Sequence, residues 1–211
     1  MDIQSAGIKF FVADPKGADL EPVLGIFHGW IQEEGRGLPA HDTALPQTGS
    51  LPRAGKELLI DVADYRHVQH GPGVVLVAHE ANYSMDNTGG RLGLLYQRKA
   101  SMNGDVQKRL RQVARAALLA CQRIESEPAL EGSVKFEGQE LQLVINDRML
   151  APNSAETFAA LEPELRRLCD TLYGGGAYAL ARTTEDPRER FTVLARAEKP
   201  VDVGELLWRL G

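Results

Sequence analysis

Cysteine, aromatic residues and long hydrophobic runs are all scarce in this chain of 211 residues. Its two cysteines, Cys121 and Cys169, have no CxxC spacing, which excludes a disulfide scaffold and favours two buried thiols in a reducing compartment. The longest uncharged apolar runs are strand-sized, so we expect no segment to span a membrane. The N-terminus lacks the basic start and apolar run of a secretory signal. These absences predict a cytoplasmic protein.

The familiar catalytic motifs are missing as well. The sequence contains no GxSxG elbow, no GxxxxGK[ST] phosphate loop and no GxGxxG after a predicted strand. His79 and Glu80 do not continue as HExxH, because position 83 is a tyrosine. The sequence therefore does not decide whether the protein is an enzyme.

Acidic residues outnumber basic ones, but the basic residues are unevenly distributed. The formal net charge at pH 7 is −5, from 24 basic and 29 acidic residues. The stretch 91–123 holds eight basic residues and one acidic residue, a net charge of +7 that leaves −12 for the remainder. Such a stretch can attract an anionic partner. The overall acidity and the lack of a nucleic-acid-binding motif make nucleic acid an unfavoured partner.

The pattern of apolar residues predicts alternating strands and helices. We expect strands over 8–13, 57–63, 74–80, 91–98, 134–136, 141–145, 178–182 and 191–197, and helices beginning at Asp19, Asn103, Asn153 and Asp202. The connections among 57–63, 74–80 and 91–98 are shorter than the dozen or so residues that a parallel crossover needs. The sequence therefore predicts an α+β fold with one or more mostly antiparallel sheets covered by helices.

This order divides the chain into two halves, βαβββα over 1–128 and ββαββα over 129–211, which we expect to pack as one compact unit. The tripeptide Leu20-Glu21-Pro22 recurs as Leu161-Glu162-Pro163, so an internal duplication of a βαββα unit is one interpretation. Between the first helix and the second strand, the segment 35–56 is rich in Gly and Pro and has no periodicity, which predicts a long surface loop.

All five histidines lie in the first 80 residues. Imidazoles near carboxylates are the ligands of Zn, Mn or Fe sites, and they also serve general acid–base catalysis. If 57–63 and 74–80 form a hairpin, then Asp64, His67 and His70 lie at its turn. His79 and Glu80 then lie at the other end, roughly 20 Å away, so one metal ion cannot bind both groups. An HxxH spacing in an exposed turn is common by chance, and a polar exposed turn is the favoured explanation of it.

The end of the hairpin with His79 and Glu80 is the stronger candidate, because these residues follow a strand apolar enough to be buried. We predict a pocket lined by His28, His79, Glu80, Tyr83, Asp86 and Arg91. His79 and Glu80 are its candidate catalytic pair, and together with His28 they are the candidate metal ligands. His28, Tyr83, Asp86 and Arg91 are candidate ligand-binding residues. The alternative is structural: His79 bonds a neighbouring backbone group and Glu80 pairs with Arg91.

Two functions remain open on this basis. The first is binding of a small polar ligand or a divalent metal at the His/Glu cluster, with catalysis as an option. The second is a non-catalytic interaction or assembly protein, which would form a homo-oligomer or bind a partner through exposed sheet edges and the basic helix face of Lys108, Arg111 and Arg115.

Overall fold

The computed structural model describes residues 3–35 and 57–211. The predicted loop therefore lies, apart from Gly35, outside the described residues. The strands are β1 (Ala6–Val12), β2 (Leu59–Tyr65), β3 (Gly73–Ala78), β4 (Ala81–Asp86), β5 (Gly93–Arg98), β6 (Phe136–Ile145), β7 (Tyr178–Arg182) and β8 (Phe191–Ala197). The α-helices are α1 (Val23–Gly35), α2 (Val106–Glu125), α3 (Ala155–Tyr173) and α4 (Val203–Leu210), and the short 3-10 helices are η1 (Thr88–Gly90) and η2 (Pro128–Leu130).

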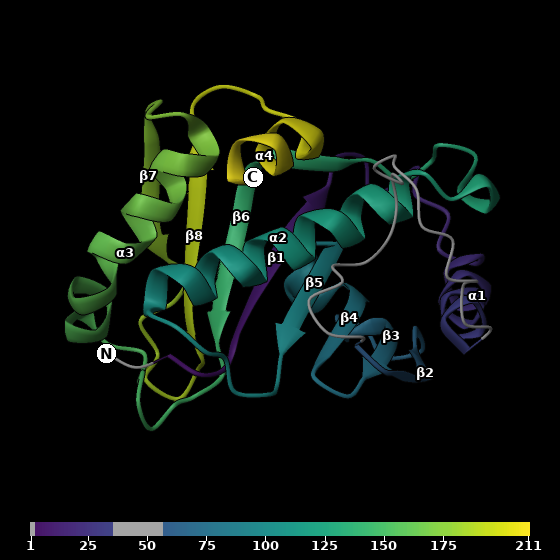
Figure 1. The fold of residues 1–211 in the computed structure, drawn as a ribbon, viewed down its shortest axis with the longest axis horizontal. Coiled ribbons are helices and arrows are strands. Elements are labelled where there is room, and N and C mark those ends of the chain that lie inside the picture. The colour runs from purple at the N-terminus through teal and green to yellow at the C-terminus, as the bar shows by residue number, and fades with distance from the viewer. Residues whose placement is uncertain (1–2, 36–56) are drawn as a thin grey trace, which may run out of the picture.

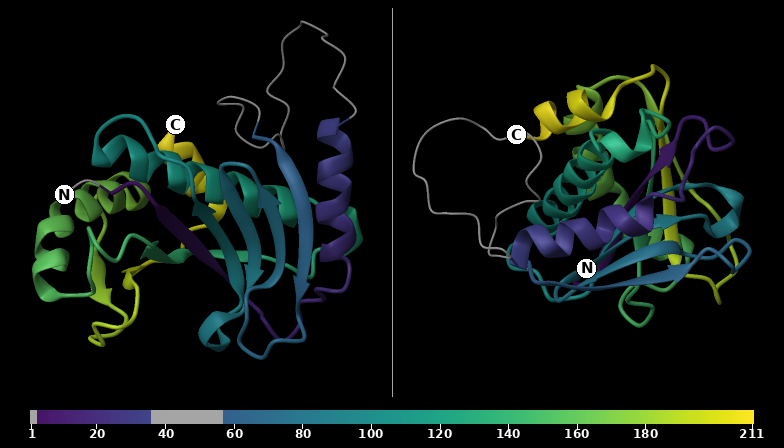
Figure 2. Two further views of the ribbon diagram at one scale, coloured as in Figure 1. Left: turned by 90° about the horizontal axis from the view of Figure 1, so that it is seen from below. Right: turned by 90° about the vertical axis from the view of Figure 1, so that its right-hand side faces the viewer.

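The eight strands form one antiparallel sheet in the order β2-β3-β4-β5-β1-β6-β8-β7. The four α-helices cover one face of this sheet (Figures 1 and 2). Helix α2 packs on β1 and β5, α1 packs on β2 and β3, and α4 contacts α2, α3 and β6. The predicted α+β class, an antiparallel sheet covered by helices, is confirmed. Strands β1 and β6 are neighbours, so residues of both predicted halves share the sheet.

Local sequence explains where the helices begin and end. The Asp105 side chain accepts a hydrogen bond from the backbone N–H of Lys108 and caps α2, and Asp202 caps α4 in the same way. Helix α3 ends at Gly174, whose φ of 65° is favourable for glycine. Its cap is Ser154 and not the predicted Asn153, and α3 continues through Pro163 as one helix. Both cysteines are buried and free, as predicted.

The strand pattern differs from the prediction at two places. Four strands separate α1 and α2, not three, because residues 81–86, between the predicted strands 74–80 and 91–98, form β4. The polar residues of this segment made it difficult to recognise as a strand, although every second side chain faces the helices. Residues 136–145 form one strand and not two, since Gly138 continues β6 and donates a backbone hydrogen bond to Val201 at 3.0 Å. The internal duplication is not confirmed.

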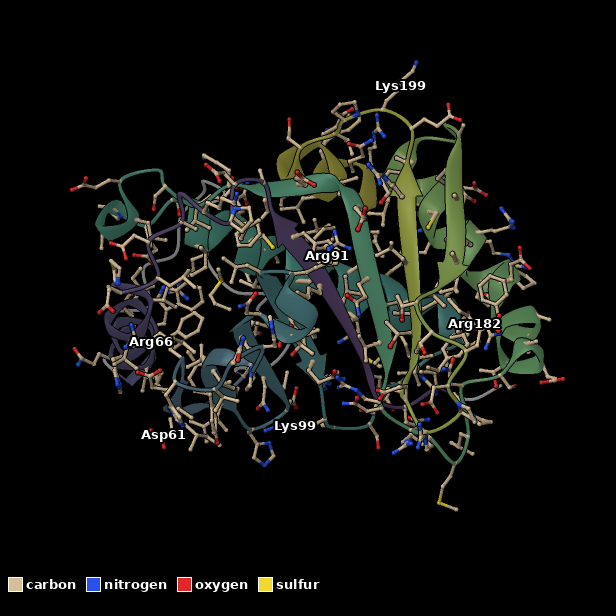
Figure 3. All side chains as sticks on the ribbon, turned by 180° about the vertical axis from the view of Figure 1, so that it is seen from behind. Asp61, Arg66, Arg91, Lys99, Arg182 and Lys199 are labelled. Carbon is tan, nitrogen blue, oxygen red and sulfur yellow. The ribbon has the colours of Figure 1, made fainter. Side chains whose placement is uncertain are left out.

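The face of the sheet away from the helices is turned to the viewer in Figure 3, and it carries polar side chains that are nevertheless buried, among them Lys9, Ser84, Asp86 and Gln97. Lys9 exposes 2% of its surface and lies flat across the sheet, because the neighbouring Gly93 has no Cβ: an added Cβ there would lie 2.9 Å from Lys9 Cε. Gln97 lies in the same way beside Gly7, where an added Cβ would lie 2.7 Å from Gln97 Oε1. We call this surface the helix-free face. No helix among the described residues is long and apolar enough to cross a bilayer.

Candidate functional site

The β2–β3 hairpin is present as predicted; Asp64 lies near the end of β2, and His67 and His70 lie in the turn that follows. Asp64 pairs with Arg66 at 2.8 Å, and this hydrogen-bonded pair lowers the pKa of Asp64 to about 2. The pair lies at the surface, where such bonds add little stability. Within residues 3–35 and 57–211, no three His, Cys, Asp or Glu side chains form a group that could hold a metal ion. The structure therefore assembles neither predicted metal site.

The structure does not bring together the six residues predicted to line one pocket. Tyr83 faces the helices, whereas Asp86, three residues further along β4, lies on the helix-free face. His28 and His79 are exposed, and among the described residues no hydrogen bond or ion pair joins either side chain to the other four. Glu80 pairs with Arg98 at 2.7 Å and not with Arg91.

Two of the predicted residues, Glu80 and Tyr83, do belong to a polar cluster on the helix side, at the end of β3, β4 and β5. The Tyr83 hydroxyl donates a hydrogen bond of 2.5 Å to Glu57 Oε2, and its ring packs edge to face on Tyr96 with centroids 5.0 Å apart. The charges of Glu80 and Arg98 both act on Glu57. We call Glu57, Glu80, Tyr83, Tyr96 and Arg98 the Glu57 cluster.

Burial shifts the acid–base properties of this cluster. Removal of water raises the pKa of Glu57 above its usual 4.5, although the hydrogen bond from Tyr83 and the charge of Arg98 oppose that rise. Burial, with the nearby Glu57 charge, also raises the pKa of Tyr96 to about 12. One carboxylate oxygen, Glu57 Oε1, is buried and has no hydrogen-bond partner among the described residues. A half-buried carboxyl group with a raised pKa and one unused oxygen is typical of functional sites.

Two more of the predicted residues, Asp86 and Arg91, lie in a second polar group on the helix-free face, where Figure 3 labels Arg91. Asp86 pairs with Lys9 at 2.5 Å, and the two side chains expose 6% and 3% of their surface. Arg91 stacks on the ring of Phe11 at 3.7 Å and pairs with Glu140 at 2.5 Å. All of these charges are partnered, which indicates a structural role for this group.

Comparison with protein-family models, curated proteins and solved structures finds no match to this chain. The site must therefore be judged on its own geometry.

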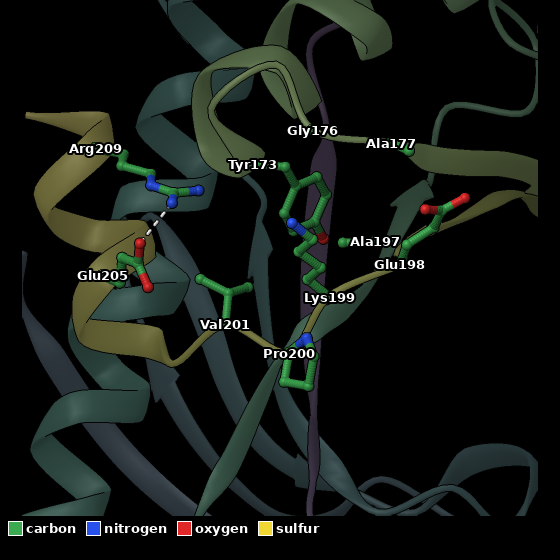
Figure 4. A pocket seen from close by; sticks show the side chains of 10 residues that line it. All are labelled: Tyr173, Gly176, Ala177, Ala197, Glu198, Lys199, Pro200, Val201, Glu205 and Arg209. Atoms are coloured by element: carbon green, nitrogen blue, oxygen red, sulfur yellow. Dashed lines mark hydrogen bonds and ion pairs between the residues drawn. The ribbon is translucent and has the colours of Figure 1, made fainter.

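A surface hollow in the second half is another place where a ligand could lie (Figure 4). Its volume is about 490 Å³, and it is lined by Tyr173, Gly176, Ala177, Ala197, Glu198, Lys199, Pro200, Val201, Glu205 and Arg209. The Arg209 guanidinium already donates to Glu205 and to the carbonyl of Leu172. Lys199 and Glu198 then carry opposite charges, so the hollow offers no strong preference for a charged ligand. The Glu57 cluster is the better candidate.

Sequence reasoning missed Glu57 and Lys9. Glu57 was assigned to the start of a strand, but β2 begins two residues later and Glu57 is instead directed at Tyr83. Lys9 lies in a strand whose other residues are apolar, and a single lysine there is normally exposed. The signal that could have identified Lys9 is the glycine at position 93, which only the strand pairing places beside it.

Proposed function

We propose that the protein binds a small polar molecule at the Glu57 cluster and that Glu57 exchanges a proton with it. The observation that carries this proposal is the unpartnered oxygen Glu57 Oε1 in a carboxyl group whose pKa is raised. A buried polar atom without a partner costs free energy, and a hydrogen-bond donor on a ligand would remove that cost.

The surroundings of Glu57 fit this role. Tyr83 fixes Glu57 Oε2, which leaves Glu57 Oε1 as the reactive oxygen. Glu80 and Arg98 neutralise each other next to it, and Glu80 exposes 39% of its side chain, so the cluster is reachable from the surface. A carboxyl group whose pKa moves toward neutrality is suited to both accepting and donating a proton near physiological pH.

The test is a thermal-shift screen of the purified protein against amino acids, hydroxy acids, sugars and nucleosides, followed by calorimetry of any compound that stabilises it. We expect a compound that raises the melting temperature of the wild type and of Glu137→Gln, an exposed control on β6. The same compound should have no effect on Glu57→Gln. No stabilising compound, or equal binding by Glu57→Gln, would refute the proposal.

A further inference from the structure

One tryptophan of this chain is largely exposed to solvent. Trp208 on α4 exposes 81% of its surface, whereas Trp30 exposes 1%. Tryptophan is a large apolar side chain that is seldom left in water, and it is enriched at the centres of protein interfaces. Helix α4 lies on the outside of the helix layer, where its C-terminal end adjoins α2 (Figure 1).

The charges around Trp208 are arranged along α4 in a definite order. The first turn is acidic, with Asp202 at the cap and Glu205 in the turn itself. The last turn adjoins the basic face of α2, where Arg111 Nη2 donates a hydrogen bond of 3.0 Å to the carbonyl of Leu210. Arg115, one turn further along α2, is exposed and makes no hydrogen bond or ion pair with any described residue. Helix α4 is about 12 Å long, so an acidic and a basic region flank Trp208 at short range.

Such a surface is complementary to itself. A two-fold axis through Trp208 turns α4 antiparallel to its copy, which brings the acidic first turn of one helix over the basic α2 face of the other. Arg209 bonds Glu205 within the chain, so the charge left for this contact on the acidic side is mainly that of Asp202. An interface that pairs the same patch on both subunits is the commonest arrangement in homo-oligomers.

We propose that this surface, made of Arg111, Arg115, Asp202, Glu205 and Trp208, is the contact between two copies of the chain in a symmetric dimer. The two Trp208 rings lie at its centre, where burial of apolar area supplies most of the attraction. The charged residues at the rim set the antiparallel orientation and speed the encounter of the two copies.

The test is sedimentation velocity over protein concentrations from low micromolar to several hundred micromolar, at low salt. We expect a concentration-dependent dimer in the wild type, and a monomer in Trp208→Ala and in Arg115→Glu. Met149→Ala is the control for the loss of an exposed apolar side chain, since Met149 is 94% exposed on a loop. Lys16→Glu is the control for charge reversal at an exposed residue. Both controls should dimerise like the wild type.

Tryptophan fluorescence gives an independent measurement, because the chain has only two tryptophans. Dilution of the wild type should shift its emission to longer wavelength as Trp208 returns to water, and Trp208→Ala should show no such shift. A wild type that stays monomeric at every concentration would overturn the proposal, and the surface would then belong to a different partner. A dimer that survives both Trp208→Ala and Arg115→Glu would overturn it too, because the contact would then lie elsewhere, for example at the edge strands β2 or β7.

Discussion

Replacement of Asp86 by alanine should destabilise the protein strongly, because it leaves Lys9 without its partner. The two groups are 2.5 Å apart, and neither side chain exposes more than 6% of its surface. Removal of one member of a buried ion pair typically costs about 3–5 kcal/mol. For a chain of this length each kcal/mol lowers the melting temperature by about 2–4 °C, which gives a fall of about 6–20 °C.

Replacement of Lys9 by methionine should cost less than replacement of Asp86, although it breaks the same ion pair. The carboxylate left behind keeps a hydrogen bond of 2.6 Å from the Thr88 hydroxyl and another of 3.3 Å from the Thr88 backbone N–H. The ammonium group of Lys9 has no second hydrogen bond to a described residue, and what remains for it is the ring of Phe11, whose centroid is 5.5 Å away. Methionine also keeps most of the length of the lysine side chain and fills the same space above Gly93.

The cost of Asp86→Ala should depend on pH. Burial lowers the pKa of Lys9 below 10.5, and Asp86 opposes that shift, so the variant lowers this pKa further. Between this lowered pKa and pH 10.5, Lys9 of the variant is protonated in the unfolded chain but not in the folded chain. Stability should therefore rise as the pH increases toward 10.5, and the deficit relative to the wild type should narrow.

Urea denaturation followed by circular dichroism at several pH values measures both effects, and Glu137→Ala is the control for loss of an exposed carboxylate. That control should change stability by less than about 0.5 kcal/mol. The reasoning fails if Asp86→Ala costs under about 1 kcal/mol, or if Lys9→Met costs as much as Asp86→Ala does.

Three further predictions follow from single residues. Because the pKa of Glu57 is raised in the folded protein, the wild type should lose stability as the pH rises from 4.5 through that raised pKa. Glu57→Gln should remove this pH dependence, which urea denaturation from acid to neutral pH measures. Trp30→Ala should cost about 3–5 kcal/mol in the same assay, since this fully buried ring leaves a large cavity. Gly93→Ala should destabilise by at least about 1–3 kcal/mol, because the added Cβ would lie 2.3 Å from the carbonyl oxygen of Phe10. Its matched control, Gly25→Ala in α1, meets no atom within 4 Å and should stabilise the protein by about 0.5–1 kcal/mol.

Each of these has a clear contrary result. A pH profile of Glu57→Gln parallel to that of the wild type would mean that Glu57 titrates normally in the folded protein. A loss below about 2 kcal/mol for Trp30→Ala would mean that the site collapses around the missing ring. A Gly93→Ala variant as stable as the wild type would contradict the close approach of β1 and β5 at that position.

Periodicity predicted most of the fold because it reports which residues face the core. The strands predicted over 178–182 and 191–197 match β7 and β8, and the helix predicted from Asn103 corresponds to α2. Strand β4 was missed because Asn82, Ser84 and Asp86 are residues that turns also favour. The burial of Ser84 and Asp86 on the helix-free face depends on contacts with other strands, which a local pattern does not contain.

The candidate site was harder to predict, because its residues are brought together by strand register. Glu80 and Tyr83 were selected for being near a histidine in the sequence, and the structure instead places them beside Glu57 and Arg98. Tyr83 lies 26 positions from Glu57 along the chain. Nothing in the local sequence around Glu57 indicates that Tyr83 is its partner.

The helix-free face also explains how the two halves of the chain are held together. On the helix side, α2 and α4 pack across residues of both halves. On the opposite side no helix does so among the described elements, and the pair of Arg91 and Glu140 links the segment between η1 and β5 to β6 instead. Arg91 reaches Glu140 because its guanidinium lies on the ring of Phe11, in the strand between them. The buried charges of this face are thus best understood as a connection between β1, β4 and β6, whereas Glu57 Oε1 on the other face has no hydrogen-bond partner among the described residues.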